Sequence, residues 1–337
     1  MFDAAIEVFS TCPPSKGEDP FAYRKQVADI SRWSERAGCR GMLIYTDNGL
    51  VDPWLLAQFV IESTDQLCPL VAVQPVYMQP YSVARMVSSL ASMYGRRIYL
   101  NMVAGGFVND LKALDDETEH DDRYRRLVEY TTIATELLRG QAEFSFSGDY
   151  YVAQDLVLRP PLRSDLFPGV FVSGSSPAGA AAARALGATA VKYPKHWSEE
   201  MATDEAETIR LGMRVGILAR PTADEAWHVA LKRFPEDRKG QITHRLAMQV
   251  SDSRWHRQLS QLGERHYSDD HPYWLGPFEN YKTFCPYLVG SYSRVGEELC
   301  RYTALGFRTF ILDVPREDED FHHIAVAFAE ALSSAPS

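Results

Sequence analysis

Short runs of aliphatic and β-branched residues recur along the chain, and between them lie segments whose apolar residues repeat at helical spacing. Runs that are apolar on both faces are typical of parallel strands covered by helices. The predicted strands span residues 4–9, 41–45, 69–73, 97–103, 169–172, 188–191, 213–219 and 307–314. The predicted helices span residues 20–37, 53–63, 80–94, 122–138, 177–186, 204–211, 223–232 and 292–304.

Eight strand–helix units in series predict an α/β protein with the (β/α)8 TIM-barrel fold rather than an open doubly wound sheet. We expect one domain over residues 1–337 with two insertions. Residues 142–158 alternate around a Ser-Gly-Asp turn, which predicts a hairpin after the fourth helix. Residues 234–288 form a long polar and aromatic insertion after the seventh strand. Because it would emerge at the carboxyl face of the barrel, we expect it to act as a lid.

The chain carries 35 basic and 45 acidic residues, a formal net charge of −10. Nucleic acids and anionic membranes select clustered Lys and Arg, so this balance argues against both as partners and favours a small-molecule substrate. No apolar run approaches the roughly 20 residues of a transmembrane helix, and no basic segment followed by an apolar one opens the chain. We therefore expect a cytoplasmic protein.

The cysteines and histidines show no ligand pattern. The five cysteines lie far apart without CxxC spacing, which disfavours a disulfide framework and a zinc site. The nine histidines form no HExxH motif and no triad of ligands recognisable in sequence. The sequence thus predicts free thiols and no metal site.

Residues 170–184 have the pattern of a buried strand, a tight Ser-Gly turn and a helix packed by small residues. Pro177 has the φ angle suited to the first turn of a helix, and Ser175 or Ser176 can cap it. Backbone N–H groups at such a helix N-terminus point at an anion, and the helix dipole adds about 0.3–1 kcal/mol. The junction therefore predicts the anchor of a phosphorylated cofactor, although an ordinary capped turn has the same pattern.

Residues that follow the strands build the active site of a (β/α)8 barrel. Polar residues at these positions are Ser10, Thr11, Thr46, Asp47, Asn48, Gln74, Asn101, Ser173, His196, Arg220 and Asp313. They include no carboxylate pair spaced for glycoside hydrolysis, no GxSxG motif and no evident Schiff-base lysine. Few acids and bases beside a phosphate anchor suit a cofactor that supplies the reactivity itself.

Two of these residues are candidates for catalysis. His196 is a candidate general base because histidine titrates near neutrality, although a surface loop histidine is the commoner case. Asp47 beside Asn48 is a well-placed polar pair, although Asp-Asn-Gly is also an ordinary turn sequence.

Several segments, in order along nearly the whole chain, carry a family resemblance. They are Leu100-Asn-Met-Val-Ala-Gly-Gly, Tyr124 with the helix after it, Phe146-Ser-Gly-Asp-Tyr-Tyr, Val172-Ser-Gly-Ser-Ser, and Tyr287-Leu-Val-Gly-Ser leading to Gly306-Phe-Arg-Thr-Phe-Ile-Leu. On these segments the chain resembles the bacterial luciferase-like flavin monooxygenases, and most of all the alkanesulfonate monooxygenases. In that family a TIM barrel binds reduced FMN supplied by a separate flavin reductase, oxygen adds to the flavin, and the resulting flavin peroxide oxidises the substrate.

The resemblance implies a reduced-FMN-dependent monooxygenase for a small organic or carrier-protein-bound substrate of specialised metabolism. Carried over position by position, the residues beside the flavin are Thr46, Gln74, Asn101, Ala104 and Gly105, and the phosphate turn is Ser173, Gly174, Ser175 and Ser176. The Gly105-Gly106 pair has its own physical reason, because absent side chains let the backbone approach a flat ring.

The departures from the family pattern concern the substrate. The alkanesulfonate enzymes carry a cysteine where Leu50 stands and a histidine where Gly216 stands, whereas Arg214 matches their arginine. A kept flavin scaffold with two changed polar positions predicts a substrate other than a sulfonate. Arg214 could bind an anionic group or assist the oxygen chemistry, and a structural ion pair is the alternative.

Two further readings stay open from the sequence. One is a deazaflavin-dependent oxidoreductase of the same superfamily, and the other is a non-catalytic flavin-binding protein. In either case the resemblance implies a homodimer or a dimer of dimers. Two helical segments offer more apolar surface than the inner helix face of a barrel requires, although these residues could instead face the strands: Trp54, Leu55, Leu56, Phe59, Val60, Met86, Leu90 and Met93.

Overall fold

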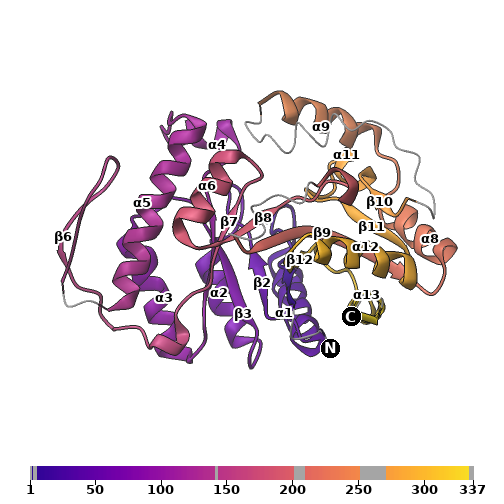
Figure 1. Ribbon diagram of the computed structural model, residues 1–337, viewed down its shortest axis with the longest axis horizontal. Coiled ribbons are helices and arrows are strands. Elements are labelled where there is room, and N and C mark those ends of the chain that lie inside the picture. The colour runs from indigo at the N-terminus through magenta and orange to yellow at the C-terminus, as the bar shows by residue number, and fades with distance from the viewer. Residues whose placement is uncertain (1, 3–5, 141–142, 201–208, 251–270, 334–337) are drawn as a thin grey trace. The chain divides into compact units, whose positions relative to one another are not determined.

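The computed structural model describes residues 2, 6–140, 143–200, 209–250 and 271–333 (Figure 1). The chain divides into two compact units. The first unit comprises Met1–Thr11, Arg32–Arg40 and Val191–Ser337, and the second comprises Cys12–Ser31 and Gly41–Ala190. No helix within the described ranges is long and apolar enough to cross a bilayer.

The second unit is built on parallel strands that pair in chain order. These strands are β2 (Gly41–Ile44), β3 (Cys68–Val73), β4 (Tyr99–Val103) and β7 (Val170–Ser173). Its helices are α2 (Pro53–Glu62), α3 (Pro80–Tyr94), α4 (Val108–Ala113), α5 (His120–Arg139) and α6 (Pro177–Leu186), with the short 3-10 helix η1 (Ser164–Leu166). The strand residues are nearly all buried, as the continuous apolar runs predicted.

The first unit is built around the long strand β9 (Leu211–Arg220). The first half of β9 pairs in parallel with β12 (Phe307–Leu312), which pairs in parallel with β1 (Glu7–Thr11). The second half of β9 pairs in parallel with β11 (Tyr287–Ser291), which pairs antiparallel with β10 (Tyr273–Trp274). The helices are α8 (Ala223–Arg233), α9 (Arg238–Val250), α11 (Gly276–Glu279), α12 (Tyr292–Ala304) and α13 (Asp318–Ser333), with the 3-10 helix η2 (Trp197–Glu199).

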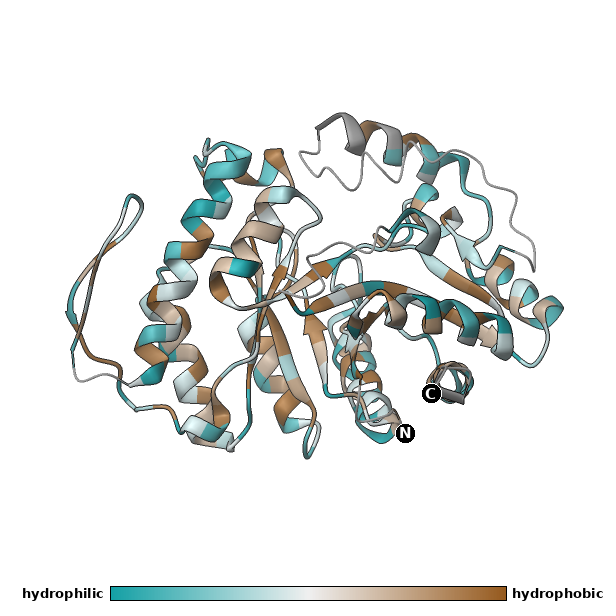
Figure 2. Cartoon of the chain, viewed as in Figure 1, coloured by the Kyte–Doolittle hydropathy of each residue, from teal (hydrophilic) through white to brown (hydrophobic). Residues whose placement is uncertain are grey.

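Two elements, α1 (Pro20–Ala37) and β8 (Thr189–Lys192), contain residues of both units. With them, each of the eight predicted strands is present, as β1, β2, β3, β4, β7, β8, β9 and β12. The predicted (β/α)8 TIM-barrel fold with insertions is confirmed. Hydrophobic residues concentrate on the strands, which Figure 2 colours largely brown.

Some boundaries differ from the expectation. The predicted helix over residues 204–211 is wrong at its end, because Leu211 opens β9, and residues 201–208 lie outside the described part. The short strands β10 and β11 were not predicted. A two-residue strand and a strand ending in Gly-Ser carry too little apolar pattern to stand out from a loop.

The described part of the insertion over residues 234–288 contributes core side chains to the first unit. Tyr273, Trp274 and Phe278 are 6%, 6% and 1% exposed. The Trp274 ring packs edge-on against Trp227 and Phe234, with centroids 5.5 and 6.1 Å apart. These aromatic residues therefore belong to the core of the first unit. The rest of the expected lid, residues 251–270, lies outside the described residues.

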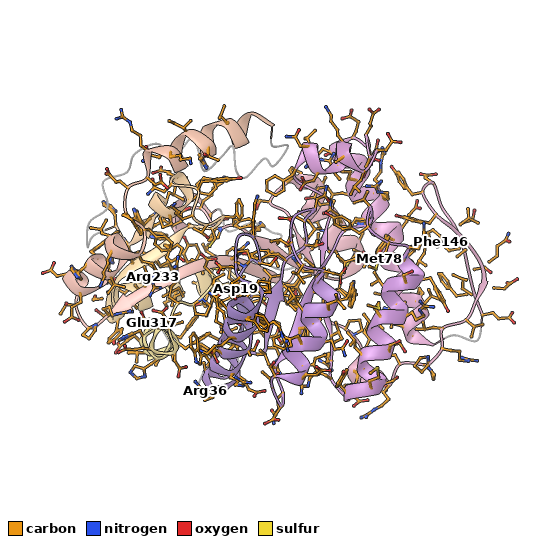
Figure 3. All side chains as sticks on the ribbon, turned by 180° about the vertical axis from the view of Figure 1, so that it is seen from behind. Asp19, Arg36, Met78, Phe146, Arg233 and Glu317 are labelled. Carbon is orange, nitrogen blue, oxygen red and sulfur yellow. The ribbon has the colours of Figure 1, made fainter. Side chains whose placement is uncertain are left out.

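A two-stranded hairpin, β5 (Phe144–Ser147) and β6 (Val152–Leu156), occupies the segment expected to form one (Figure 3 labels Phe146). The carboxylate of Glu129, on α5, holds its turn by accepting the backbone N–H groups of Asp149, Tyr150 and Tyr151 at 2.8, 2.9 and 3.1 Å. A Cβ at Gly148 would lie 2.5 Å from the same carboxyl group, so glycine makes this approach possible.

We expect Glu129→Ala to release the hairpin turn from α5, because three charge-assisted hydrogen bonds lose their acceptor. Amide hydrogen exchange at residues 149–151 should rise at least tenfold. Glu136→Ala is the matched control, since Glu136 lies on the same helix and forms an ion pair with Arg139. Unchanged exchange in Glu129→Ala would show that the turn is held by its own strands.

Candidate functional site

The turn between β7 and α6 has the geometry of an anion site. Ser176 is the N-cap of α6, with its Oγ accepting the N–H of Gly179 at 3.1 Å, and Pro177 begins the helix. Ser176 is 5% exposed. The hydroxyls of Ser173, Ser175 and Ser176 thus precede the positive end of a ten-residue helix, where a phosphate is stabilised.

Tyr124, on α5, contacts this turn. Its hydroxyl donates to the Ser173 carbonyl at 3.5 Å and is hydrogen-bonded to Ser176. Burial raises the pKa of Tyr124, so the hydroxyl stays protonated. A Cβ at Gly174 would lie 2.2 Å from the Tyr124 hydroxyl oxygen, and one at Gly179 would lie 3.3 Å from the ring. The absence of side chains at the two glycines therefore allows Tyr124 to pack against the turn.

The carboxyl end of β4 connects to the same turn. Ser173 Oγ donates to Asn101 Oδ1 at 2.7 Å, and Asn101 is 4% exposed. Gly105 has a φ of +98°, and a Cβ there would meet Gln74 Nε2 at 3.0 Å. A Cβ at Gly106 would meet nothing within 4 Å. Glycine backbone with open space beside it, next to amide groups, fits a flat ring with polar edges.

The structure therefore brings together most of the predicted flavin residues within the second unit. Asn101 lies within β4 and Ser173 ends β7, whereas Gln74, Ala104, Gly105, Gly174, Ser175 and Ser176 follow β3, β4 and β7. Gln74 and Ala104 are buried. Thr46 follows β2 and is half-buried.

Asp47 takes part in a local turn. Its Oδ1 accepts the N–H of Gly49 at 2.6 Å, which is the ordinary role of Asp in this sequence context. The neighbouring Asn48 accepts from the Tyr77 hydroxyl at 2.7 Å and donates to the Asp110 carbonyl at 3.1 Å. Burial and the carboxylates of Asp110 and Asp47 raise the pKa of Tyr77 to about 12. Tyr77 and Asp110 are polar neighbours that the sequence patterns did not single out.

His196 caps the 3-10 helix η2 in the first unit. Its Nδ1 lies 2.7 Å from Ser198 Oγ and accepts the Ser198 N–H at 3.4 Å. The Nδ1 atom is thus engaged in the cap of η2. This geometry suits a loop cap better than a general base.

Arg214, on β9, forms an ion pair with Asp313, which directly follows β12. The Nη2–Oδ1 distance is 3.3 Å, and the side chains are only 5% and 10% exposed. Arg214 Nη1 also donates to the Tyr193 hydroxyl at 3.3 Å. The sequence left open whether Arg214 binds an anion or assists the oxygen chemistry, or forms a structural ion pair. The structure contains the ion pair.

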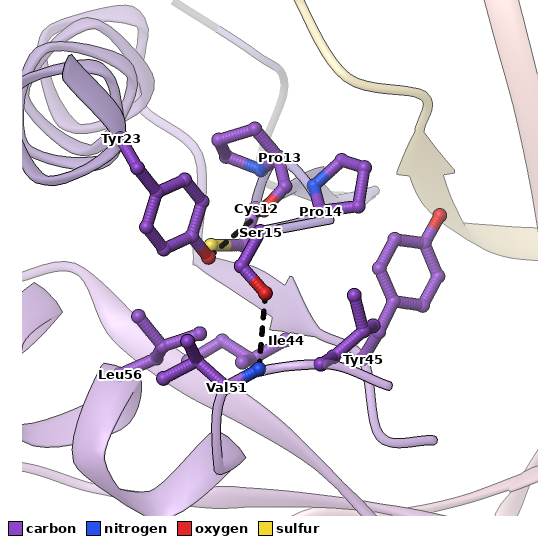
Figure 4. Close-up of a pocket in the computed structure, with 10 residues that line it drawn as sticks. Cys12, Pro13, Pro14, Ser15, Tyr23, Ile44, Tyr45, Val51 and Leu56 are labelled. Atoms are coloured by element: carbon purple, nitrogen blue, oxygen red, sulfur yellow. Dashed lines mark hydrogen bonds between the residues drawn. The ribbon is translucent and has the colours of Figure 1, made fainter. Parts of the chain in front are cut away.

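Two cavities open in the second unit, and neither includes a predicted site residue. The first, of about 10 Å³, is lined by Cys12, Tyr23 and the Ser15–Val51 hydrogen bond (Figure 4). It has room for a single water molecule. The second is an open groove of about 830 Å³ between the start of α1 and the outer side of α2.

Comparison with known proteins gives the following matches. The profile of the family described as "Luciferase-like monooxygenase" matches residues 6–309. A curated relative from Niallia circulans, 4-(gamma-L-glutamylamino)butanoyl-(BtrI acyl-carrier protein) monooxygenase BtrO, is 31% identical over 311 residues, or 90% of each chain.

Two solved structures share the fold at low sequence identity. EDTA monooxygenase EmoA from Chelativorans sp. BNC1 has a TM-score of 0.76 at 13% identity and covers 98% of this chain and 94% of its own. The oxygenating constituent of 3,6-diketocamphane monooxygenase from Pseudomonas putida, in complex with FMN, has a TM-score of 0.67 at 15% identity and covers 98% and 99%.

We expect Gly174→Ala to destabilise the protein by about 1–3 kcal/mol, because the added methyl overpacks against the Tyr124 hydroxyl. Adding Tyr124→Phe should recover part of that loss, since it removes the nearest atom. Denaturant unfolding of both variants measures this. Gly106→Ala, where the methyl meets open space, is the control and should change stability by less than about 0.5 kcal/mol. Equal losses in Gly174→Ala with and without Tyr124→Phe would contradict the proposed contact.

Proposed function

The chain belongs to the luciferase-like monooxygenase family, and from that premise we propose that it is a reduced-FMN-dependent monooxygenase acting on a small organic or carrier-bound acyl substrate. The observation that carries the proposal is the hydrogen bond from Ser173 to Asn101. It joins a capped helix N-terminus, suited to a phosphate, to a glycine-lined strand end, suited to a flat ring.

The residues of the second unit fit FMN group by group. The hydroxyls of Ser175 and Ser176 and the N-terminus of α6 would hold the phosphate. Gln74 and Asn101 would offer amide donors and acceptors to the polar edge of the ring, and Gly105 would let the ring lie close to the backbone. Tyr124 acts as a positioning residue, because it fixes the Ser173–Ser176 turn without facing the anion.

Reduced FMN would supply the two electrons with which one oxygen atom of O2 enters the substrate and the other leaves as water. The chain's own residues would bind and orient the flavin and the substrate and would exclude water from them. Among the candidate catalytic residues, Arg214 is placed to donate hydrogen bonds from its pair with Asp313. Asp47 and His196 remain candidates whose observed contacts are a turn and a cap.

Two partners follow from the same proposal. A separate flavin reductase would deliver the reduced cofactor. The name of the Niallia circulans relative, which specifies an acyl-carrier-protein substrate, supports a carrier-bound acyl group as the substrate here. A protein of this kind would work in the cytoplasm, where reductase and carrier protein are found.

We expect the protein to bind reduced FMN in an anaerobic titration followed by tryptophan fluorescence. Ser175→Asp combined with Ser176→Asp should weaken this binding more than tenfold, or about 1.4 kcal/mol, because fixed negative charge would meet the phosphate dianion. Aspartate also caps helices, so folding is preserved. The matched control is the double Asn variant, which caps without charge and should retain most of the affinity.

The competing cofactor is tested in the same titration. Tighter binding of a reduced deazaflavin than of reduced FMN would replace the proposed monooxygenase by a hydride-transfer enzyme. Incorporation of ¹⁸O from labelled O2 into an acyl carrier substrate, with a flavin reductase present, tests the reaction. Flavin binding without oxygen consumption above that of free reduced FMN would identify a binding protein instead.

We also propose a homodimer, or a dimer of dimers, associated through the outer faces of α2 and α3. Of the apolar residues of these helices named from the sequence, Trp54, Val60 and Leu90 are buried within the second unit. Leu55 and Met93, however, are 64% and 69% exposed. Exposed apolar side chains on helices that contact each other support an association surface.

Light scattering at micromolar concentration should give at least twice the chain mass of 38.0 kDa. Leu55→Lys combined with Met93→Glu should shift the mass to that of one chain, because two charges would be desolvated at the interface. Leu231→Lys, at a partly exposed leucine of α8, is the control and should leave the mass unchanged. A single-chain mass for the unaltered protein would rule out the association.

A further inference from the structure

A buried charge network in the first unit surrounds Asp313. One carboxylate oxygen, Oδ1, lies 3.3 Å from Arg214 Nη2. The other, Oδ2, accepts the hydroxyl of Thr283 at 2.6 Å and that of Tyr287 at 2.7 Å. With side chains 5% and 10% exposed, Arg214 and Asp313 are largely shielded from water. Asp313 is thus held by three donors from three different segments of the chain.

Tyr287 is a fixed proton donor in this network. Burial and the Asp313 carboxylate raise the pKa of Tyr287 well above its ordinary value. The hydroxyl is therefore protonated at neutral pH and donates to Asp313. Thr283 and Tyr287 therefore both donate to the same oxygen of Asp313, Oδ2.

Gly216 makes room for Tyr287. In the parallel pairing of β9 with β11, Gly216 is the register partner of Tyr287. A Cβ at position 216 would lie 2.2 to 2.4 Å from three atoms of the Tyr287 ring. Any side chain there would displace the ring and with it the hydroxyl that donates to Asp313. The absence of a side chain at 216 is therefore linked to the position of the Asp313 carboxylate.

An arginine guanidinium on a strand is a strong site for a carboxylate, sulfonate or phosphate. Here the partner is the chain's own carboxylate. A substrate anion that approached Arg214 would meet the negative charge of Asp313, and at low dielectric this repulsion exceeds that in water. The internal pair leaves hydrogen-bond donors but no net positive charge for a ligand.

We propose that Asp313 is a specificity-determining residue that occupies the anion-binding position of Arg214, so that the substrate is uncharged where it approaches this arginine. The inference rests on the proposed monooxygenase function and deepens it. It excludes alkanesulfonates and free carboxylates bound head-first at Arg214, and it fits an amide, ester or thioester group. Asp313 lies at the carboxyl end of β12, the end of a barrel strand at which substrates bind.

The test is the binding of methanesulfonate, measured by titration calorimetry with and without oxidised FMN. The unaltered protein should bind methanesulfonate at most weakly, and Arg214→Gln should not change that affinity. Asp313→Ala leaves Arg214 charged, with room for a small anion, and should bind methanesulfonate at least tenfold more tightly than the unaltered protein. Asp313→Asn removes the negative charge without making room for the anion, so its affinity for methanesulfonate should rise less. Adding Arg214→Gln to Asp313→Ala should abolish the gain.

Asp318→Ala is the matched control, because Asp318 forms an exposed ion pair with Arg36 and should not alter anion binding. The proposal fails if Asp313→Ala or Asp313→Asn, shown folded by circular dichroism, gains no affinity for the anion. It also fails if the unaltered protein binds methanesulfonate and loses that binding in Arg214→Gln, a result that needs no Asp313 variant to fold. Calorimetry measures the binding of the anion directly and needs no turnover. A failure of the protein to bind FMN would therefore be seen as a separate result.

Discussion

The parallel pairing of β4 with β7 is the constraint on which the candidate cofactor site depends. Its register places Asn101 opposite Phe171 and Val103 opposite Ser173. Parallel strands end at the same edge, so the glycines after β4 and the serines after β7 lie at one edge of the sheet. Ser173 then reaches Asn101 across the two strands. An antiparallel or shifted pairing would separate the glycines after β4 from the serine turn after β7.

In each unit, a glycine leaves room for a tyrosine ring from another segment of the chain. Gly174 admits Tyr124 to the phosphate turn, and Gly216 admits Tyr287 to Asp313. In each case the missing Cβ lets an aromatic hydroxyl from a distant segment reach a buried polar group. Buried polar groups need such partners, because an unpaired carboxylate would cost several kcal/mol. A side chain at either glycine would therefore disturb both the packing of a tyrosine ring and the hydrogen bond of its hydroxyl.

The first unit shows how a barrel strand end can keep polar residues and yet offer no net charge. Arg214 and Asp313 neutralise each other, and two hydroxyls complete the carboxylate's hydrogen bonds. A substrate group meeting this cluster would find dipoles and not an ion. This contrasts with the β7–α6 turn of the second unit, where hydroxyls and a helix N-terminus favour an anion.

The sequence by itself determined the eight barrel strands and a capped turn at Ser175 or Ser176, and the structure identifies Ser176 as the cap. Both are local: apolar runs, Pro177 at the helix start and serine caps act over a few residues. Tertiary structure alone decided that Arg214 pairs with Asp313, which lies 99 positions away, and that the aromatic residues near Trp274 pack in a core. It also assigned Asp47 to a turn and His196 to a cap. The reason is physical, because the partner of a polar or aromatic side chain depends on which segments the folded chain brings together, and periodicity carries no information about that.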